Sequence, residues 1–540
     1  MFELLEEKET IKIVMLLTIQ RECKQFADAA FFHEHTAKML DSLGVSSKSQ
    51  RSFERYIKEI EEDILFYNLE SKIPLKFVGN EIVNDLSLPL HISYLMDRYL
   101  LGSIKFLLVY AAFRGKTMPS FEMMDWLTEN IQPSPSSNRE FSISPNTLRK
   151  KRDELNESFK PLGFSINKKY VFEGEEKSIR IFLFVQYLRN FNALTELETS
   201  LQDKRFKRFY YQVNEHAKII MSELKDDLAY QSIKWEQFLM ILIGVTTIRN
   251  LNENFLSKTK LKYYNNTALI KDTRLANIIS IFQKELSKKI APEQLKVETF
   301  FIINFLYVFD FPFTASFDDF FSTRLKADLD STKSIIMSLF EDKFKQPFKH
   351  EDKLLFSKNF HKVLLQLLFF ENYDTGMKSN LEYFKHHYPI VTPIILSSTK
   401  SLSEHFPKLN RLIFNGKASC SLFNNYFSQL IHPAILTFYN NSSYNEDIIN
   451  NYIVKANICI EVFGGIAKKQ FIEQALMQKF NLRANFQDFP DETTNFYITD
   501  IIASNEKAIN ASIFEWRIGT SDPMLENFAN TVKNWQFEHL

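Results

Sequence analysis

ISPNTLRKKRDELNESFKPLGFSI, residues 143–166, predicts a helix whose first turn is polar and basic. Ser144 is a natural N-cap, and Pro145 takes the first helical position, where its missing N–H costs nothing. Leu148, Leu155 and Phe159 form the inward face. The exposed start of the helix carries Asn146, Thr147, Arg149, Lys150, Lys151 and Arg152. A DNA recognition helix needs such positive charge for phosphates and such forked donors for guanine.

The residues that follow this helix predict a small β-wing. FSINKKYVFEGEEKSIRIF, residues 164–182, indicates a strand, a turn with Lys168 and Lys169, a second strand and a new helix. Apolar helices over Met96–Ala112 and Phe121–Ile131 precede it. The alternative is a solvated charged face, but cap, charge and hairpin agree on a winged helix-turn-helix unit.

A similar order of patterns occurs earlier in the chain. Helices are predicted over Leu4–Ile19 and Thr36–Leu43, and Ser46 and Ser47 are candidate N-caps of a third, within SSKSQRSFERYIKEIEEDI. Near the start of that third helix lie Ser49, Gln50, Arg51, Ser52 and Arg55. KIPLKFVGNEIV, residues 72–83, suits a second wing. A plain three-helix bundle stays an equal alternative here. The first 100 residues are also net acidic, which counts against a strong nonspecific contact with DNA.

Composition bounds the class of protein. A chain of 540 residues needs several domains, and only 12 glycines favour long helices over β-rich folds or phosphate-cradling loops. The 66 basic and 66 acidic residues balance, so any DNA contact must rest on local patches. Cys23, Cys420 and Cys459 follow no metal-ligand spacing. We expect a cytoplasmic protein with no metal, cofactor, signal peptide or membrane span.

The rest of the chain divides into a helical middle and an α/β end. From Phe182 to about Ile431, amphipathic helices recur with almost no strand pattern. Lys455–Leu482 then indicates a strand, a turn and a helix. Further strands are predicted in LRANFQ and NFYITDII, with helical segments from there to the end. This order favours a small domain with a parallel sheet.

The second unit resembles the Mga/AtxA family of bacterial virulence regulators. Gly174-Glu175-Glu176-Lys177-Ser178-Ile179-Arg180 is similar to the family's helix start after the wing, and SFERYIKEIEEDI looks like the recognition helix of its first unit. The resemblance implies a mainly α, multidomain protein. Its domains would be winged helix-turn-helix units at 1–88 and 89–182, helical phosphotransferase-system regulation domains at 183–304 and 305–432, and an enzyme IIB-like α/β domain at 433–540.

The resemblance also implies partners and a mode of control. The family's helical domains are phosphorylated on histidine by phosphocarrier proteins of the sugar uptake system, for which His216, His361 and His386 are candidates here. An ordinary core or helix-end histidine is the favoured alternative for each. Phe463 stands about where a catalytic IIB domain has its cysteine, and Cys459 falls inside the preceding strand. The last domain therefore looks like an interaction or dimerisation module.

These patterns predict a homodimeric or higher-order regulator of double-stranded promoter DNA that is not an enzyme. Two other classes stay open. An RNA-binding antiterminator with the same regulatory domains would begin with a small β-rich domain, whereas this chain begins with predicted helices. An active phosphotransferase component would need a nucleophile, and Phe463 argues against one.

Overall fold

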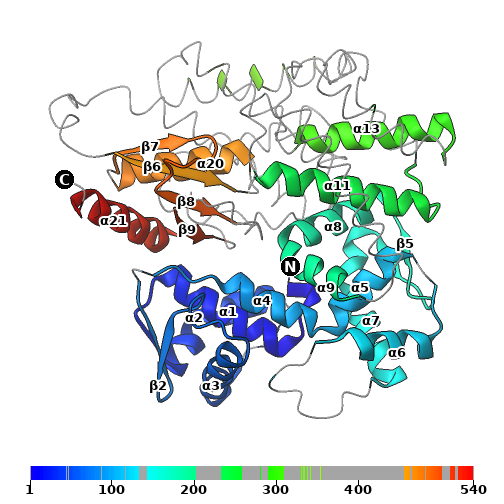
Figure 1. Ribbon diagram of the computed structural model, residues 1–540, viewed down its shortest axis with the longest axis horizontal. Coiled ribbons are helices and arrows are strands. Elements are labelled where there is room, and N and C mark those ends of the chain that lie inside the picture. Colours follow the sequence, from blue (N-terminus) through cyan, green and yellow to red (C-terminus); the bar gives the residue numbers. More distant parts are fainter. Residues whose placement is uncertain are drawn as a thin grey trace.

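The computed structural model describes most of the N-terminal 200 residues and parts of the remainder. These are residues 2–201, 233–257, 290–308, 455–500, 511–516 and 521–538, apart from 44, 47, 87, 116, 133, 134, 136–142, 463, 464 and 481, with single residues between 280 and 353. Within them, helices dominate, and strands form two small N-terminal sheets and one C-terminal sheet (Figure 1). The predicted mainly helical class is confirmed.

The N-terminal unit has the order helix, strand, helix, helix, strand, strand. Its elements are η1 Phe2–Leu4, α1 Glu7–Glu22, β1 Phe26–Ala27, α2 Ala29–Ser42, α3 Gln50–Phe66, β2 Leu75–Val78 and β3 Glu81–Asn84. β3 pairs with both β1 and β2, antiparallel in each case. Gly79 stands in the turn between β2 and β3 with φ +65°, a left-handed conformation that favours glycine. The wing predicted over residues 72–83 is present.

Two helix starts in this unit differ from those predicted. Helix α2 begins at Ala29 rather than near Thr36, because the side chain of Asp28 accepts a hydrogen bond from the N–H of Phe31 at 2.8 Å. The prediction that Ser46 or Ser47 caps the third helix is wrong, since α3 begins after Ser49. Lys48 instead pairs with Glu7 of α1, 2.5 Å from Nζ to Oε1.

The second unit contains the helix predicted within residues 143–166 and the wing predicted after it. Its elements are α4 Ile92–Leu101, α5 Ile104–Arg114, α6 Ser120–Asn130, α7 Pro145–Phe159, η3 Lys160–Leu162, β4 Phe164–Ile166 and β5 Phe172–Gly174, with β4 and β5 antiparallel. The prediction of a single helix over Met96–Ala112 is wrong, because the helix is interrupted between α4 and α5. There the buried Ser103 donates its hydroxyl to the carbonyl of Leu4, 2.6 Å away.

Among the described residues beyond the second unit, the chain forms the helices α8 Glu176–Arg189, α9 Phe191–Ser200, α11 Ile233–Leu251 and α13 Pro292–Val308, of which α11 and α13 lie above that unit in Figure 1. The ring of Phe184 on α8 lies 4.6 Å from that of Phe238 on α11 and 4.5 Å from that of Phe305 on α13. α8 continues through residue 182 and α13 through 304, so the domain boundaries stay predictions. His216, His361 and His386 lie outside the described residues.

The C-terminal domain is built on a four-stranded sheet. Its elements are β6 Ala456–Glu461, α20 Gly465–Gln474, the π-helical η8 Ala475–Lys479, β7 Ala484–Gln487, β8 Phe496–Thr499, β9 Ser512–Glu515 and α21 Asp522–Glu538. The strand order is β7-β6-β8-β9 with every pair parallel, which confirms the predicted parallel α/β arrangement. The expectation that only helices follow β8 is wrong, since β9 completes the sheet.

Of the two residues compared with an enzyme IIB site, Cys459 and Phe463, the structure describes only the first. Cys459 is fully buried within β6, as predicted, and Phe463 lies outside the described residues. The sheet therefore agrees with the predicted fold of the domain, while its enzyme IIB-like character stays a prediction.

The C-terminal domain packs against the first unit, where α21 and β9 lie beside α1 (Figure 1). The carboxylate of Glu515, at the end of β9, accepts a hydrogen bond from the Ser93 hydroxyl in the first turn of α4, at 2.8 Å. Negative charge is favoured at that end of a helix. Cys23 lies in the same contact, its Sγ 3.3 Å from the carbonyl oxygen of Pro523, and burial raises the pKa of its thiol to about 12.

Candidate nucleic-acid interface

Helix α7 presents a capped, polar N-terminal end to solvent. The Ser144 hydroxyl accepts a hydrogen bond from the N–H of Thr147 at 3.1 Å, and Pro145 occupies the first turn, as predicted. Leu148, Leu155 and Phe159 are buried against the unit. Because this inward face fixes the rotation of the helix, Asn146 and the two residues after Leu148 point outward.

The four basic residues of α7 fall into two pairs. Arg149 and Lys150 are exposed, and neither makes an ion pair with any residue the structure describes. Lys151 is turned back, with its Nζ 2.6 Å from Glu6 and 3.3 Å from Glu154. Arg152 is half-buried and pairs with Asp153 at 2.8 Å. Arg149 and Lys150 are therefore the charges that this helix offers to a ligand.

The neighbourhood of Lys151 explains why it packs rather than projects. Burial lowers the pKa of the Lys151 ammonium, but the hydrogen bond and charge of Glu6 outweigh this and raise the pKa above its ordinary value. Lys105 of α5 also reaches Glu154, at 3.0 Å. Lys151 thus ties α7 to the N-terminal segment of the chain.

The wing beside α7 is held by two asparagines. Asn156 of α7 donates to the carbonyl of Ile166 at 2.9 Å and accepts from its N–H at 2.7 Å, which fixes β4 on the helix. Asn167 accepts from the N–H groups of Lys169 and Val171, at 2.8 and 3.2 Å, and so shapes the turn. Lys168 and Lys169 are exposed at its tip.

The corresponding helix of the first unit, α3, carries less free positive charge. Ser49, Gln50 and Arg51 are exposed at its start, and the Ser52 hydroxyl lies 3.1 Å from that of Ser49. Arg55 lies over the ring of Tyr56, 5.1 Å from its centroid, with Glu59 at 3.8 Å. The helix has three basic and five acidic residues, against four and three in α7.

The comparison with protein-family models identifies the second unit. Residues 89–187 match the model of the Mga helix-turn-helix domain. The chain carries an Mga helix-turn-helix domain. This is a domain of DNA-binding transcription regulators, and the resemblance noted at Gly174–Arg180 falls inside the match. No curated protein matches the chain.

A buried ion pair within the first unit also accepts a hydrogen bond from the Mga helix-turn-helix domain. Lys12 of α1 lies 2.6 Å from Asp63 of α3, with both side chains almost fully buried. Tyr99 of α4, inside the Mga domain, donates its hydroxyl to the same carboxylate. One carboxylate of α3 is thereby fixed to a helix of the second unit.

The residues that organise the Mga domain were not all predicted from sequence. Asn156 and Asn167 position the wing, yet the sequence analysis did not single them out. The Asn-Lys-Lys turn was the signal for Asn167, since asparagine side chains bind the backbone two residues on. Asn156 gave no local signal, because its partner Ile166 lies across a turn.

Two further observations concern other kinds of site. Among the described residues, no group of three or more His, Cys, Asp or Glu is placed to hold a metal ion. None of the described helices is both long and apolar enough to cross a membrane.

Proposed function

We propose that the chain regulates transcription by placing α7 in the major groove of promoter DNA, with its wing on the adjacent phosphates. The observation that carries this is the capped end of α7, which leaves Arg149 and Lys150 free within an Mga helix-turn-helix domain. Asn146 and Arg149 suit base edges. An arginine can donate to both O6 and N7 of guanine, whereas an asparagine donates to N7 of adenine and accepts from its N6 amino group. Lys168 and Lys169 suit phosphates. Thr147 is also placed to contact a phosphate. Lys151 and Arg152, which pair with Glu6 and Asp153, serve mainly to stabilise the position of α7.

A second contact comes from the first unit. Ser49, Gln50, Arg51, Ser52 and Arg55 stand at or near the start of α3 in the same relation to their wing as the α7 residues. Because Arg55 already contacts Tyr56 and Glu59, and because α3 carries more acidic than basic residues, we assign α3 a weaker DNA contact that positions the protein. The bond network around Asp63 supports a fixed orientation of the two helices on one DNA molecule.

The test is a gel-shift titration of the full chain against the DNA upstream of its own gene, at several salt concentrations. Arg149→Ala/Lys150→Ala is expected to weaken binding about tenfold or more. The slope of log affinity against log salt should fall by about 0.9 for each lost phosphate contact. Lys296→Ala on α13 is the matched control, because it removes an exposed charge whose ion-pair partner among the described residues is the equally exposed Glu293. Unchanged affinity and slope in the double variant would falsify α7 as the main contact.

Control by the sugar uptake system is a further part of the proposal, supported by the resemblance alone. Phosphorylation of His216, His361 or His386 by phosphocarrier proteins would add negative charge to the helical region and shift its packing. Labelling the purified chain with those carriers tests this. Labelling that is unchanged in a variant lacking all three histidines would remove them from the proposal.

We also propose that the C-terminal α/β domain supports a homodimer or higher homo-oligomer. Sedimentation of the full chain, with and without residues 455–540, would test this. A monomer at micromolar concentration would contradict it.

A further inference from the structure

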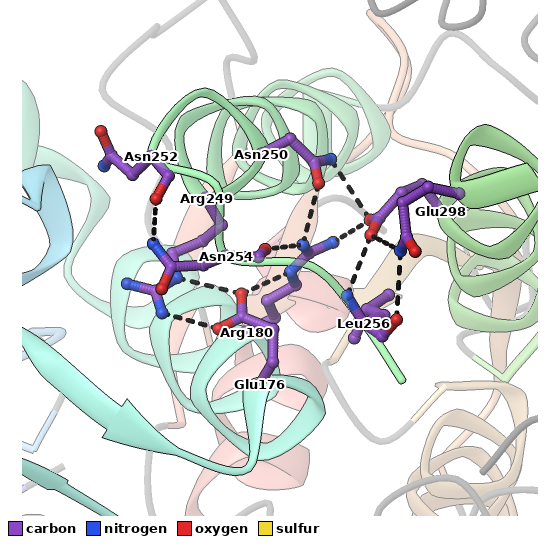
Figure 2. Close-up of polar contacts among 9 residues, drawn as sticks. Glu176, Arg180, Arg249, Asn250, Asn252, Asn254, Leu256 and Glu298 are labelled. Atoms are coloured by element: carbon purple, nitrogen blue, oxygen red, sulfur yellow. Dashed lines mark hydrogen bonds and ion pairs between the residues drawn. The ribbon is translucent and has the colours of Figure 1, made fainter. Parts of the chain in front are cut away.

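The helix start Gly174–Arg180, which follows the second wing, leads into a buried cluster of opposite charges. Glu176 and Arg180 of α8, Arg249 and Asn250 of α11, and Glu298 of α13 form this cluster, called here the α8–α11–α13 ion network (Figure 2). The Arg180 and Glu298 side chains are fully buried, and Arg249 nearly so. Two guanidinium groups and two carboxylates balance, so no net charge is buried.

Every charged group in the network is held by more than one partner. Both oxygens of Glu176 accept from Arg249, at 3.0 and 2.6 Å, and one of them also accepts from Arg180 at 2.8 Å. Arg180 reaches Glu298 and the carbonyl of Asn254. Glu298 also accepts from the N–H of Leu256, at 3.1 Å, and from Gln294, at 3.0 Å. Paired planar groups of this kind fix orientation as well as distance.

On one side, the network continues directly into the wing. Glu176 stands two residues after Gly174, the last residue of β5. Gly174 has φ +127°, and a Cβ there would lie 2.5 Å from the carbonyl oxygen of Gly163, so this position needs a glycine packed directly against the start of β4. Arg249 also lies over the ring of Phe172 in β5, 5.9 Å from its centroid. The wing and the first turn of α8 therefore move together.

On the other side, the network reaches the helical region at the C-terminal end of α11. Asn252, just after α11, donates to the carbonyl of Arg114 at the end of α5, at 3.0 Å. A Cβ at Gly115 would lie 2.3 Å from the same Asn252 side chain. The segment after α11 is thus fitted to the Mga domain at two places, the ion network and the end of α5.

We propose that Arg249 and Glu298 are positioning residues for DNA binding, which transmit the placement of α11 and α13 through Glu176 and Arg180 to the wing lysines Lys168 and Lys169. This rests on the proposed function only in its last step, the contact of the wing with DNA. The helical region acts on a defined element of the Mga domain, the wing, and leaves the bases read by α7 unchanged.

The first test needs no DNA. Amide hydrogen exchange of the full chain is measured for the second wing, residues 164–174, and the first wing, residues 75–84. Arg249→Met is expected to speed exchange in the second wing about tenfold and to leave the first wing unchanged. Lys296→Met, on α13 but exposed, is the matched control and should change neither wing. Unchanged exchange in the second wing, or equal acceleration in both wings, overturns the proposal.

The second test measures the salt dependence of DNA binding. Arg249→Met should reduce the slope by the same amount as Lys168→Ala/Lys169→Ala, about 1.8 for two phosphate contacts. Combining the two changes should reduce it no further, and an additive loss contradicts the proposal. Where Arg249→Met does not fold, Arg249→Lys replaces it in both tests, since lysine keeps the charge but cannot hold both oxygens of Glu176. A chain that binds no DNA would overturn the proposed function and leave the exchange test to decide the coupling.

Discussion

Both winged units place a helix just before a β-hairpin, α3 before β2–β3 and α7 before β4–β5, but they use their charged residues differently. In the first unit, Lys12 and Asp63 are buried between α1 and α3, and Arg55 is engaged by Tyr56 and Glu59. In the second, Arg149 and Lys150 at the capped end of α7 are exposed and make no ion pair with any residue that the structure describes. The helix before the hairpin therefore serves mainly as a support in the first unit and mainly as a ligand-facing surface in the second.

The largest expected effect concerns the buried pair of the first unit. Lys12→Met leaves Asp63 buried without its cation, and breaking such a pair costs about 3–5 kcal/mol of stability. Urea unfolding of the full chain measures this in the transition that includes the N-terminal unit. Lys48→Met is the control, because its pair with Glu7 is partly exposed and should contribute less than about 1 kcal/mol. Equal losses in the two variants would remove the supporting role from Lys12.

The second expected effect is a pH dependence at the contact between α5 of the second unit and α9. Glu198 of α9 is buried beside Tyr110 of α5, with Arg114 and Tyr187 near its carboxyl. Burial raises the pKa of Glu198 to about 7, although Arg114 and the Tyr110 hydrogen bond act against this. The folded chain therefore holds a proton between about pH 4.5 and 7 that the unfolded chain releases, so stability falls as pH rises through this window.

The size of this effect follows from the shift in pKa. The wild-type chain should lose about 3 kcal/mol of folding stability between pH 4.5 and 7.5 because of Glu198. Glu198→Gln should not show this loss, and urea unfolding at each pH measures it. Glu157→Gln, an exposed residue of α7, is the control. If the two variants follow the wild-type pH profile equally, the carboxyl of Glu198 is already ionised in the folded chain.

The third prediction compares the two recognition helices directly. Arg51→Ala/Arg55→Ala should weaken DNA binding by about twofold to threefold, against about tenfold or more for Arg149→Ala/Lys150→Ala, because Arg55 already has partners in the chain. Gel-shift titrations of both double variants at one salt concentration decide it. A larger loss of DNA affinity in the Arg51→Ala/Arg55→Ala variant would mean that α3, and not α7, is the main DNA contact.

Local patterns were enough to predict the surface of the second unit. The cap Ser144, Pro145 and the inward leucines lie within one helix, and the wing follows within a few residues, so their interactions depend on spacing along the chain. The same holds for the turn at Gly79. The strand β9 was missed because four residues with two buried side chains carry too little periodicity to be seen.

Contacts between distant segments could not be predicted in this way. The sequence places Lys151 in a basic cluster, yet Glu6, in the N-terminal segment of the chain, turns the charge of Lys151 inward. Asp63 reads as one more acidic residue of α3, and its partners Lys12 and Tyr99 come from two other helices. Glu515 binds the first turn of α4 from the far end of the chain. Such choices depend on packing that a single sequence does not encode locally.

The smallest expected effect compares the two helix caps. The Ser144 hydroxyl accepts a hydrogen bond from the N–H of Thr147, whereas Ser49, at the equivalent position before α3, makes no such bond to its helix. Ser144→Ala should therefore cost about 1 kcal/mol of stability, and Ser49→Ala only a few tenths. Thermal unfolding of both variants, with the salt dependence of DNA binding as a second measurement, separates the two.

The second measurement distinguishes capping from direct contact with DNA. Loss of the Ser144 cap frees the first turn of α7 to fray, which should weaken binding while leaving the salt slope nearly unchanged, because no phosphate-binding charge is removed. Equal stability losses at both positions would mean that Ser49 caps α3 in solution. The starts of α3 and α7 would then differ in their charges and not in their caps, and capping would not explain why α7 binds DNA more strongly than α3.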